Sequence, residues 1–516
     1  MSKRIRTVAQ AFLPVFALCW TAQAQTPQAV PAFTAPGPSA PSAPAPQPAA
    51  PAAPRPIKIG NVTVQGSFRT RYEGWVSFQG DSGDNSYGYS GNLLRLSFLQ
   101  SQKSFDWQLE FALPFLLGLP DNAVAAGTQG QLGMGASYFI SNNRSQYSAM
   151  PFAKQGFLRF RRLGGSAAQS LRIGRFEFLD GSETTPKNAT LAPLKRDRIV
   201  QRLIGNFGWA HVQRSFDGAQ YLHSKPSATF TFVGGIPTRG VFQTNGWGET
   251  NTAFGYAALT KPWGKGAHSA ETRALAIYYH DWRPIVKADN RALAARRTDL
   301  NNIRIGTFGG HHLSAVTTRA GTLDLVAWAV GQSGRWGRLG HRAYSVALEA
   351  GIQPARLPKL KPWFRGGYTK GSGDGNPNDQ THGTFFQILP TPRPYARFPF
   401  FNMMNNRDIM GALMLRPHQN ITISSEFHAL ALSKASDLWY LGGGVFQPWT
   451  FGYTGRSAAG ARSLANLYDT SLEYRFKPNV TFTGYIGYAD GRAAIAAIYP
   501  RGASGTLEYL ELNFRF

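Results

Sequence analysis

Arginines recur at alternate positions in several segments of this chain, as Arg69 and Arg71 do, and again Arg159 and Arg161. Alternate side chains of a β-strand share one face. A guanidinium group forms paired hydrogen bonds with a carboxylate, and cations inside a low-dielectric wall focus a positive potential. The spacing therefore predicts an anion-binding surface. The candidate residues from these strands are Arg69, Arg71, Arg95, Arg159, Arg161 and Arg172.

A second interpretation of these arginines is that they pair with acids in a structural network. Arg69 or Arg71 could pair with Glu73, and Arg475 could pair with Glu473. Both interpretations stay open for each single arginine. For the set as a whole the first is favoured, because 54 Lys and Arg residues face 28 Asp and Glu residues and pairing cannot neutralise them all.

The elements that must position these residues are amphipathic strands. Val62, Val64, Phe68 and Tyr72 share one parity, and the last ten residues, LEYLELNFRF, alternate in the same way and end on Phe516. A helix has a period of 3.6 residues and cannot separate such sets. The pattern predicts an all-β fold, a closed antiparallel transmembrane β-barrel with lipid outside and water inside. About eighteen alternating segments occur, and sixteen strands remain an alternative.

The first 56 residues are of a different kind. Residues 1–24 carry Lys3, Arg4 and Arg6, then a short apolar run and Ala22-Gln23-Ala24, which predicts a signal peptide removed after Ala24. Residues 25–56 are rich in Pro and Ala and predict a disordered linker with no core. Residues 57–516 form the predicted barrel, which the leader directs to the outer membrane of a Gram-negative-type cell.

Gly-, Asn- and Pro-rich stretches separate some of the strands. Those at 116–150, 180–206, 283–300, 371–406 and 433–463 predict long extracellular loops that fold over or into the mouth. Aromatic residues near strand ends predict an interfacial girdle that includes Trp75, Trp263, Trp363 and Tyr440.

The net charge of +26 usually indicates nucleic acid or an anionic membrane surface as partner. Neither partner suits an exported barrel, and lysine or arginine facing lipid would cost roughly 2–4 kcal/mol near the midplane. The cations therefore belong in the lumen, the loops or the interfaces. No GxSxG or HExxH motif and no paired acid and base can be placed, so neither an enzyme nor a cofactor is predicted.

One loop is rich in oxygen ligands. The stretch GSGDGNPND at 371–379 carries Asp374, Asn376, Asn378 and Asp379. Calcium prefers such oxygens, but the acid that closes a twelve-residue calcium loop is missing. An ordered loop without metal is the favoured interpretation, and a calcium site is the alternative.

Three segments resemble the alginate export family of outer-membrane barrels. They are LRIGRFEFLDGSE with RLIGNFGWAHVQRSFDGAQY at 171–221, YTKGSGDGNPNDQTHGTFFQILPTPRPYARFPFFNMMN at 368–405, and SDLWYLGGG at 436–444. The resemblance implies an eighteen-stranded monomeric barrel that exports an anionic uronate polysaccharide through an electropositive constriction. It also implies that Arg214 and Asp217 lie at or near the pore lining.

The sequence thus predicts an outer-membrane channel for anionic, carboxylated, sugar-derived substrates. The alternatives are a general anion-selective porin for small acids, and an enzyme or adhesin anchored by its barrel. The expected partners are outer-membrane lipid, the anionic saccharide or small acid, and a periplasmic export protein, but not nucleic acid.

Overall fold

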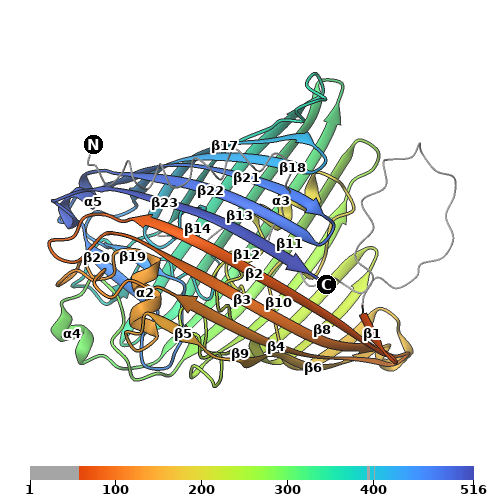
Figure 1. Cartoon of the computed structure of the whole chain (residues 1–516), viewed down its shortest axis with the longest axis horizontal. Helices are drawn as coiled ribbons and strands as arrows, with labels where there is room; N and C mark the ends of the chain where they lie inside the picture. Colours follow the sequence, from red (N-terminus) through yellow and green to blue (C-terminus); the bar gives the residue numbers. More distant parts are fainter. Residues whose placement is uncertain (1–56, 392–394, 400) are drawn as a thin grey trace.

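The computed structural model describes residues 57–391, 395–399 and 401–516. The predicted signal peptide and linker lie outside the described residues. Within them the chain forms one closed barrel of oblique strands, with most of its loops gathered at one end (Figure 1). None of the described helices is long and apolar enough to cross a membrane.

Eighteen antiparallel strands make the wall of the barrel, which confirms the predicted fold. They are β2 (Val62–Val76), β3 (Ser86–Ser101), β4 (Phe105–Leu117), β6 (Phe152–Arg161), β7 (Gln169–Phe176), β8 (Phe216–Lys225), β9 (Ala228–Pro237), β10 (Thr252–Trp263), β11 (His268–Asp281), β12 (Ile303–Thr318), β13 (Gly321–Trp336), β14 (Leu339–Pro354), β15 (Trp363–Gly371), β17 (Asn406–His418), β18 (Ile421–Leu432), β21 (Ser463–Lys477), β22 (Val480–Gly491) and β23 (Ser504–Arg515).

Short elements complete the described chain. The strands β1 (Ile57–Ile59), β5 (Tyr147–Ala149) and β16 (Thr381–His382) pair at the margins of the wall, and β19 (Leu438–Gly442) pairs with β20 (Tyr453–Ser457) in a separate hairpin. The helices are α2 (Met134–Ser141), η1 (Leu163–Gly165), α3 (Leu191–Arg198), α4 (Leu293–Arg297) and α5 (Ala493–Ile498).

The first and last wall strands close the ring. β2 pairs with β23 over ten residues, from Ser67 opposite Arg515 to Val76 opposite Thr506. The alternation of the carboxy-terminal segment therefore matches that of β2, so Phe514 stands opposite Phe68 on one face of the wall. Closure leaves the sheet without a free edge, as a membrane-spanning sheet requires.

The two faces of the wall have opposite chemistry. In β17, Ile409 is 62% exposed on the outer surface, whereas its neighbour Asp408 is 1% exposed on the inner one. Apolar side chains on the outer face have hydrocarbon as their solvent, and the polar inner face is covered by other protein groups.

The predicted aromatic girdle is correct for Trp263, which is exposed, and wrong for three other residues. Trp75 has the parity of Arg71 and faces inward, where its indole donates to Glu73 at 3.0 Å. Trp363 likewise donates inward to Asp324, at 2.7 Å, and Tyr440 belongs to the loop hairpin. Strand parity, rather than nearness to a strand end, decides which way an aromatic ring points.

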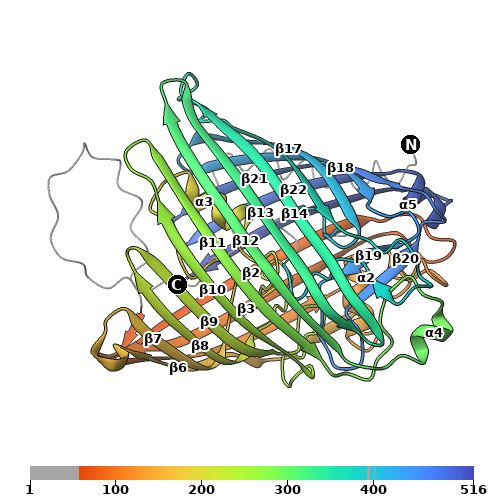
Figure 2. The ribbon, with the colours of Figure 1, turned by 180° about the vertical axis from the view of Figure 1, so that it is seen from behind.

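The connections are mostly short at one end of the barrel and long at the other, where the two-residue turn 337–338 between β13 and β14 is an exception. Turns such as 226–227, 319–320 and 478–479 lie at one end, called here the short-turn end, where the chain also terminates (Figure 1). The five predicted long loops lie at the other, long-loop end, together with 77–85, 238–251 and 492–503. Figure 2 shows β12, β13 and β14, of 16 residues each, on the face of the barrel that is turned away in Figure 1.

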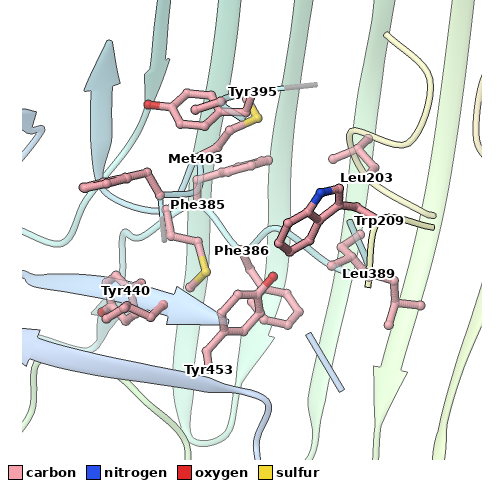
Figure 3. Close-up of a cluster of buried hydrophobic side chains, with 14 of the residues drawn as sticks. Leu203, Trp209, Phe385, Phe386, Leu389, Tyr395, Met403, Tyr440 and Tyr453 are labelled. Atoms are coloured by element: carbon pink, nitrogen blue, oxygen red, sulfur yellow. The ribbon is translucent and has the colours of Figure 1, made fainter. Parts of the chain in front are cut away.

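The main hydrophobic cluster lies inside the barrel and combines infolded loop residues with inward-facing residues of the wall strands. Trp209, Leu389, Met403 and Tyr453 are among its buried residues, and Figure 3 shows them gathered within the wall. They come from three different connections, so the predicted infolding of the long loops is correct and fills much of the lumen.

Candidate functional site

Residues 177–215, between β7 and β8, cross the lumen and are called here the crossing segment. Two wall arginines hold it at β2. Arg69 donates to the carbonyl oxygens of Gly208 at 2.9 Å and Ala210 at 2.5 Å, and Arg71 donates to that of Trp209 at 2.9 Å. Three successive peptide carbonyls are thus bound by neighbouring lumen-facing guanidinium groups. The Arg71 guanidinium also stacks on the Trp209 ring, 4.4 Å from its centroid.

The same segment is anchored to strands far from β2 around the ring. On β14, Glu349 accepts two hydrogen bonds from Arg198, at 2.8 and 3.0 Å, and one from Arg202 at 3.0 Å. On β11, Glu271 forms an ion pair with Lys195 at 2.6 Å. The crossing segment is thus fixed on one side by Arg69 and Arg71 and on the other by Glu349 and Glu271. This segment and its contacts with the wall are called here the brace.

Arg214 holds the infolded loops together. Its guanidinium donates to the carbonyl oxygens of Gly443, Val445 and Pro390, at 2.6, 3.0 and 3.3 Å. The side chain is 0% exposed, and burial lowers the pKa of Arg214 to about 10. The structure thus places Arg214 in a buried contact between loops rather than on the surface of a channel.

Two neighbouring cavities lie inside the barrel. The larger, about 1160 Å³ and called here the basic vestibule, is lined by turn residues such as Gln419 and Pro478, so it opens at the short-turn end. The smaller, about 620 Å³ and called here the outer pocket, is lined by long-loop residues including Phe446 and Trp449. Trp209 and Thr391 line both cavities, so they lie where the two adjoin, a place called here the divide.

The divide is fixed to the crossing segment. The Thr391 hydroxyl donates to Gln201 at 2.7 Å and accepts from the backbone amide of Phe207 at 3.0 Å. On the other side of the passage, Arg71 holds Trp209 through its carbonyl and its ring. Both groups that separate the cavities are therefore positioned by the brace.

Cations exceed acids on the described lining of the basic vestibule. Eleven Arg and Lys residues stand against six Asp and Glu residues. Among the described residues, no carboxylate lies within salt-bridge distance of the Arg416, Arg475 or Arg515 side chains, which line the vestibule near its opening. The lining residues with basic side chains are Arg69, Arg71, Arg95, Arg196, Arg198, Lys361, Arg365, Arg397, Arg416, Arg475 and Arg515.

Three of the predicted arginines, Arg69, Arg71 and Arg95, line this vestibule. Arg71 also pairs with Glu511 at 2.7 Å and Glu73 at 3.1 Å. Arg95 pairs with Glu110 at 2.6 Å and with Glu177 of the crossing segment at 2.9 Å. These guanidinium groups therefore combine structural pairing with a place on the cavity wall.

The other candidates lie outside the vestibule lining. Arg159 and Arg161 both pair with Asp106, the former at 2.8 Å. Arg172 lies over the Phe176 ring at 4.2 Å. Asp217 accepts from Arg175 on the neighbouring strand at 2.7 Å. The structure thus gathers one part of the predicted set at the cavity and distributes the rest in local pairs of the wall.

The oxygen-rich loop is ordered by its own backbone. Asp374 accepts from the amide of Asn376 at 3.0 Å, Asn376 from that of Asn378 at 3.1 Å, and Asp379 from that of Thr381 at 2.8 Å. Within the part of the chain that the structure describes, no group of three or more His, Cys, Asp or Glu residues could hold a metal ion. The loop is therefore ordered by its own hydrogen bonds, and the calcium alternative at Asp374, Asn376 and Asp379 stays a prediction.

Sequence reasoning missed the residues that form the divide and the brace. Trp209 lies inside one of the family-like segments, but its apolar character gives no sign that it separates two cavities. Lys195 and Arg198 lie three residues apart in the last turn of α3, so they share one side of the helix, and Arg202 follows after the helix has ended. This cluster of basic residues is the signal that could have indicated acidic partners on the wall.

A closed barrel with apolar outer face, infolded loops and an internal basic cavity defines an outer-membrane β-barrel channel. The alginate export family model matches residues 145–489, so the chain belongs to the alginate export family. Among solved structures, it resembles three outer-membrane proteins of Pseudomonas aeruginosa, each with 88% of this chain and 98% of the other covered. They are OpdK (8% identity, TM-score 0.52), OccK9 or OpdG (8%, 0.54) and OccK8 or OprE (10%, 0.50). No curated protein matches the sequence.

Proposed function

We propose that this protein passes anionic, carboxylate-bearing, sugar-derived substrates across the outer membrane as a monomeric channel. The observation that carries the proposal is the basic vestibule, where eleven cationic side chains stand against six acids. Several weakly held sites suit conduction, because a permeating ion must be attracted and must also leave. Family membership supports a uronate-type substrate, and such a sugar acid presents the carboxylate that a guanidinium group binds in two places.

Arg416, Arg475 and Arg515 are the side chains that would meet the substrate first from the short-turn end. They line the vestibule near its opening, without a carboxylate partner among the described residues. Arg69, Arg71 and Arg95 lie deeper and would extend the positive surface up to the crossing segment. A periplasmic export partner would dock at this end, where the vestibule opens.

The test is the reversal potential of the purified channel in a planar bilayer under a potassium chloride gradient. We expect a potential of the sign set by chloride movement. A cation-selective channel would overturn the proposal. The matched variant is Arg475→Ala, which removes one lining cation that takes part in no described ion pair, and it should shift the potential toward zero.

A second function, passage of small organic acids, is favoured by the division of the lumen. Cavities of about 1160 and 620 Å³, separated at Trp209 and Thr391, suit small solutes better than a continuous polymer in this conformation. Liposome uptake of monomeric galacturonate, compared with current block by its oligomers, separates the two functions. Uptake of the monomer without any block by oligomers would favour the small-acid porin.

A further inference from the structure

We propose that the outer pocket is a saccharide-binding subsite, which recognises a neutral pyranose ring by stacking and by hydroxyl hydrogen bonds. The inference deepens the proposed function, because it adds a second type of contact beyond charge. It rests on three features of the pocket: its aromatic lining, its buried unpaired polar atoms, and its open mouth.

The lining supplies flat apolar surfaces at successive depths. Trp449 is 57% exposed at the mouth, Phe446 and Phe451 lie buried below it, and Trp209 lies at the inner end. The aliphatic C–H groups of a pyranose face pack against an aromatic ring in the way other apolar faces do. Trp449, over which Arg239 lies at 4.9 Å from the ring centroid, therefore offers a sugar its stacking position at the mouth, and the deeper rings make an apolar floor below it.

Two polar atoms in the pocket lining, both from the loop between β18 and β21, lack a hydrogen-bond partner among the described residues. Gln447 is 4% exposed, and neither its Oε1 nor the Thr450 hydroxyl has a hydrogen-bond partner among the described residues. A buried polar atom without a partner is costly, so a ligand that satisfies it gains affinity. Gln447 Oε1 only accepts, so it needs a donor, which a hydroxyl provides and an ionised carboxylate does not.

The charges around the pocket agree with this occupant. Arg456 is the one charged residue among its described lining residues, and it is 4% exposed. Its guanidinium is directed to the Tyr499 hydroxyl, so it is occupied inside the protein. The pocket therefore selects by ring shape and hydroxyl groups, whereas the basic vestibule selects by charge.

The test uses maltotriose, a neutral glucose trimer, as a blocker of single-channel current. Added at the long-loop side, it should produce resolved closures. Trp449→Ala and Gln447→Leu should each shorten the dwell time, by roughly fivefold for the loss of one hydrogen bond or one stacked ring. Trp247→Ala is the matched control, because Trp247 is also exposed at the long-loop end but does not line the pocket. It should leave the dwell time unchanged.

Three results would overturn the inference: no block by maltotriose, equal dwell times in all four proteins, or block by benzyl alcohol but not by the sugar. The last result would assign the pocket to aromatic compounds instead. Because maltotriose carries no charge, each of these results leaves the reversal potential unaffected. A failed subsite and a failed anion selectivity are therefore separate outcomes.

Discussion

Replacing Arg69 with alanine should loosen the crossing segment while the barrel stays folded. The substitution removes two hydrogen bonds from a charged group, at 2.9 and 2.5 Å, to the carbonyls of Gly208 and Ala210. Each such bond contributes about 1.5–3 kcal/mol, so the cost of displacing this part of the segment should fall by about 3 kcal/mol. That is roughly a hundredfold rise in the population of displaced conformations. Arg71 still holds Trp209, so the segment is weakened rather than released.

The assay is single-channel recording at fixed voltage. Arg69→Ala should show frequent transitions to higher conductance, because displacement of the crossing segment joins the basic vestibule to the outer pocket. Arg475→Ala is the control: it removes an equal charge from the same cavity but touches no part of the crossing segment. If Arg69→Ala and Arg475→Ala change the current in the same way, charge alone explains the result and the brace does not limit conduction.

Three other predictions follow from described contacts. Glu349→Ala leaves the guanidinium groups of Arg198 and Arg202 without their buried acid, so it should destabilise the protein by about 3–5 kcal/mol, measured by thermal unfolding in detergent; an unchanged midpoint would contradict the brace. Burial raises the pKa of Asp437 from 3.8 to about 6, so folding favours its protonated form. The stability that Asp437 contributes is greatest below about pH 4 and is lost as the pH rises through about 6. The midpoint of thermal unfolding should therefore fall as the pH rises from about 4 through about 6, and Asp437→Asn should remove this part of the pH dependence. Finally, adding calcium or EDTA should leave the unfolding midpoint unchanged, since Asp374, Asn376 and Asp379 already accept backbone amides; a rise in the midpoint with calcium would restore the metal alternative.

The wall of the barrel was predictable because lipid imposes one strict rule on it. Every second side chain of a wall strand contacts hydrocarbon, so apolar residues recur at every second position in segments such as β2 and β23. The pattern is less reliable just ahead of β8, which begins at Phe216. There the apolar loop residues Trp209 and Val212 are buried inside the lumen and resemble part of a strand.

The roles of individual arginines were not predictable in the same way. Strand parity says that Arg69 points inward, but the carbonyls that it binds come from residues 139 and 141 positions away. Arg214 shows the same limit, because its partners Val445 and Pro390 belong to two other loops. A long-range contact of this kind depends on how loops fold into the lumen, and no local period encodes that.

The brace also imposes an order on assembly. Arg69 and Glu349 stand on strands that come to enclose one space once β23 has paired with β2. Until then the crossing segment has no pair of walls to span, and its cations and the wall acids stay hydrated. The full set of contacts that narrows the channel can therefore exist only in the closed cylinder. A barrel in which β2 and β23 had paired but the crossing segment was not yet bound would be a more open ring. The contacts that narrow the channel are therefore also a sign that the barrel is complete.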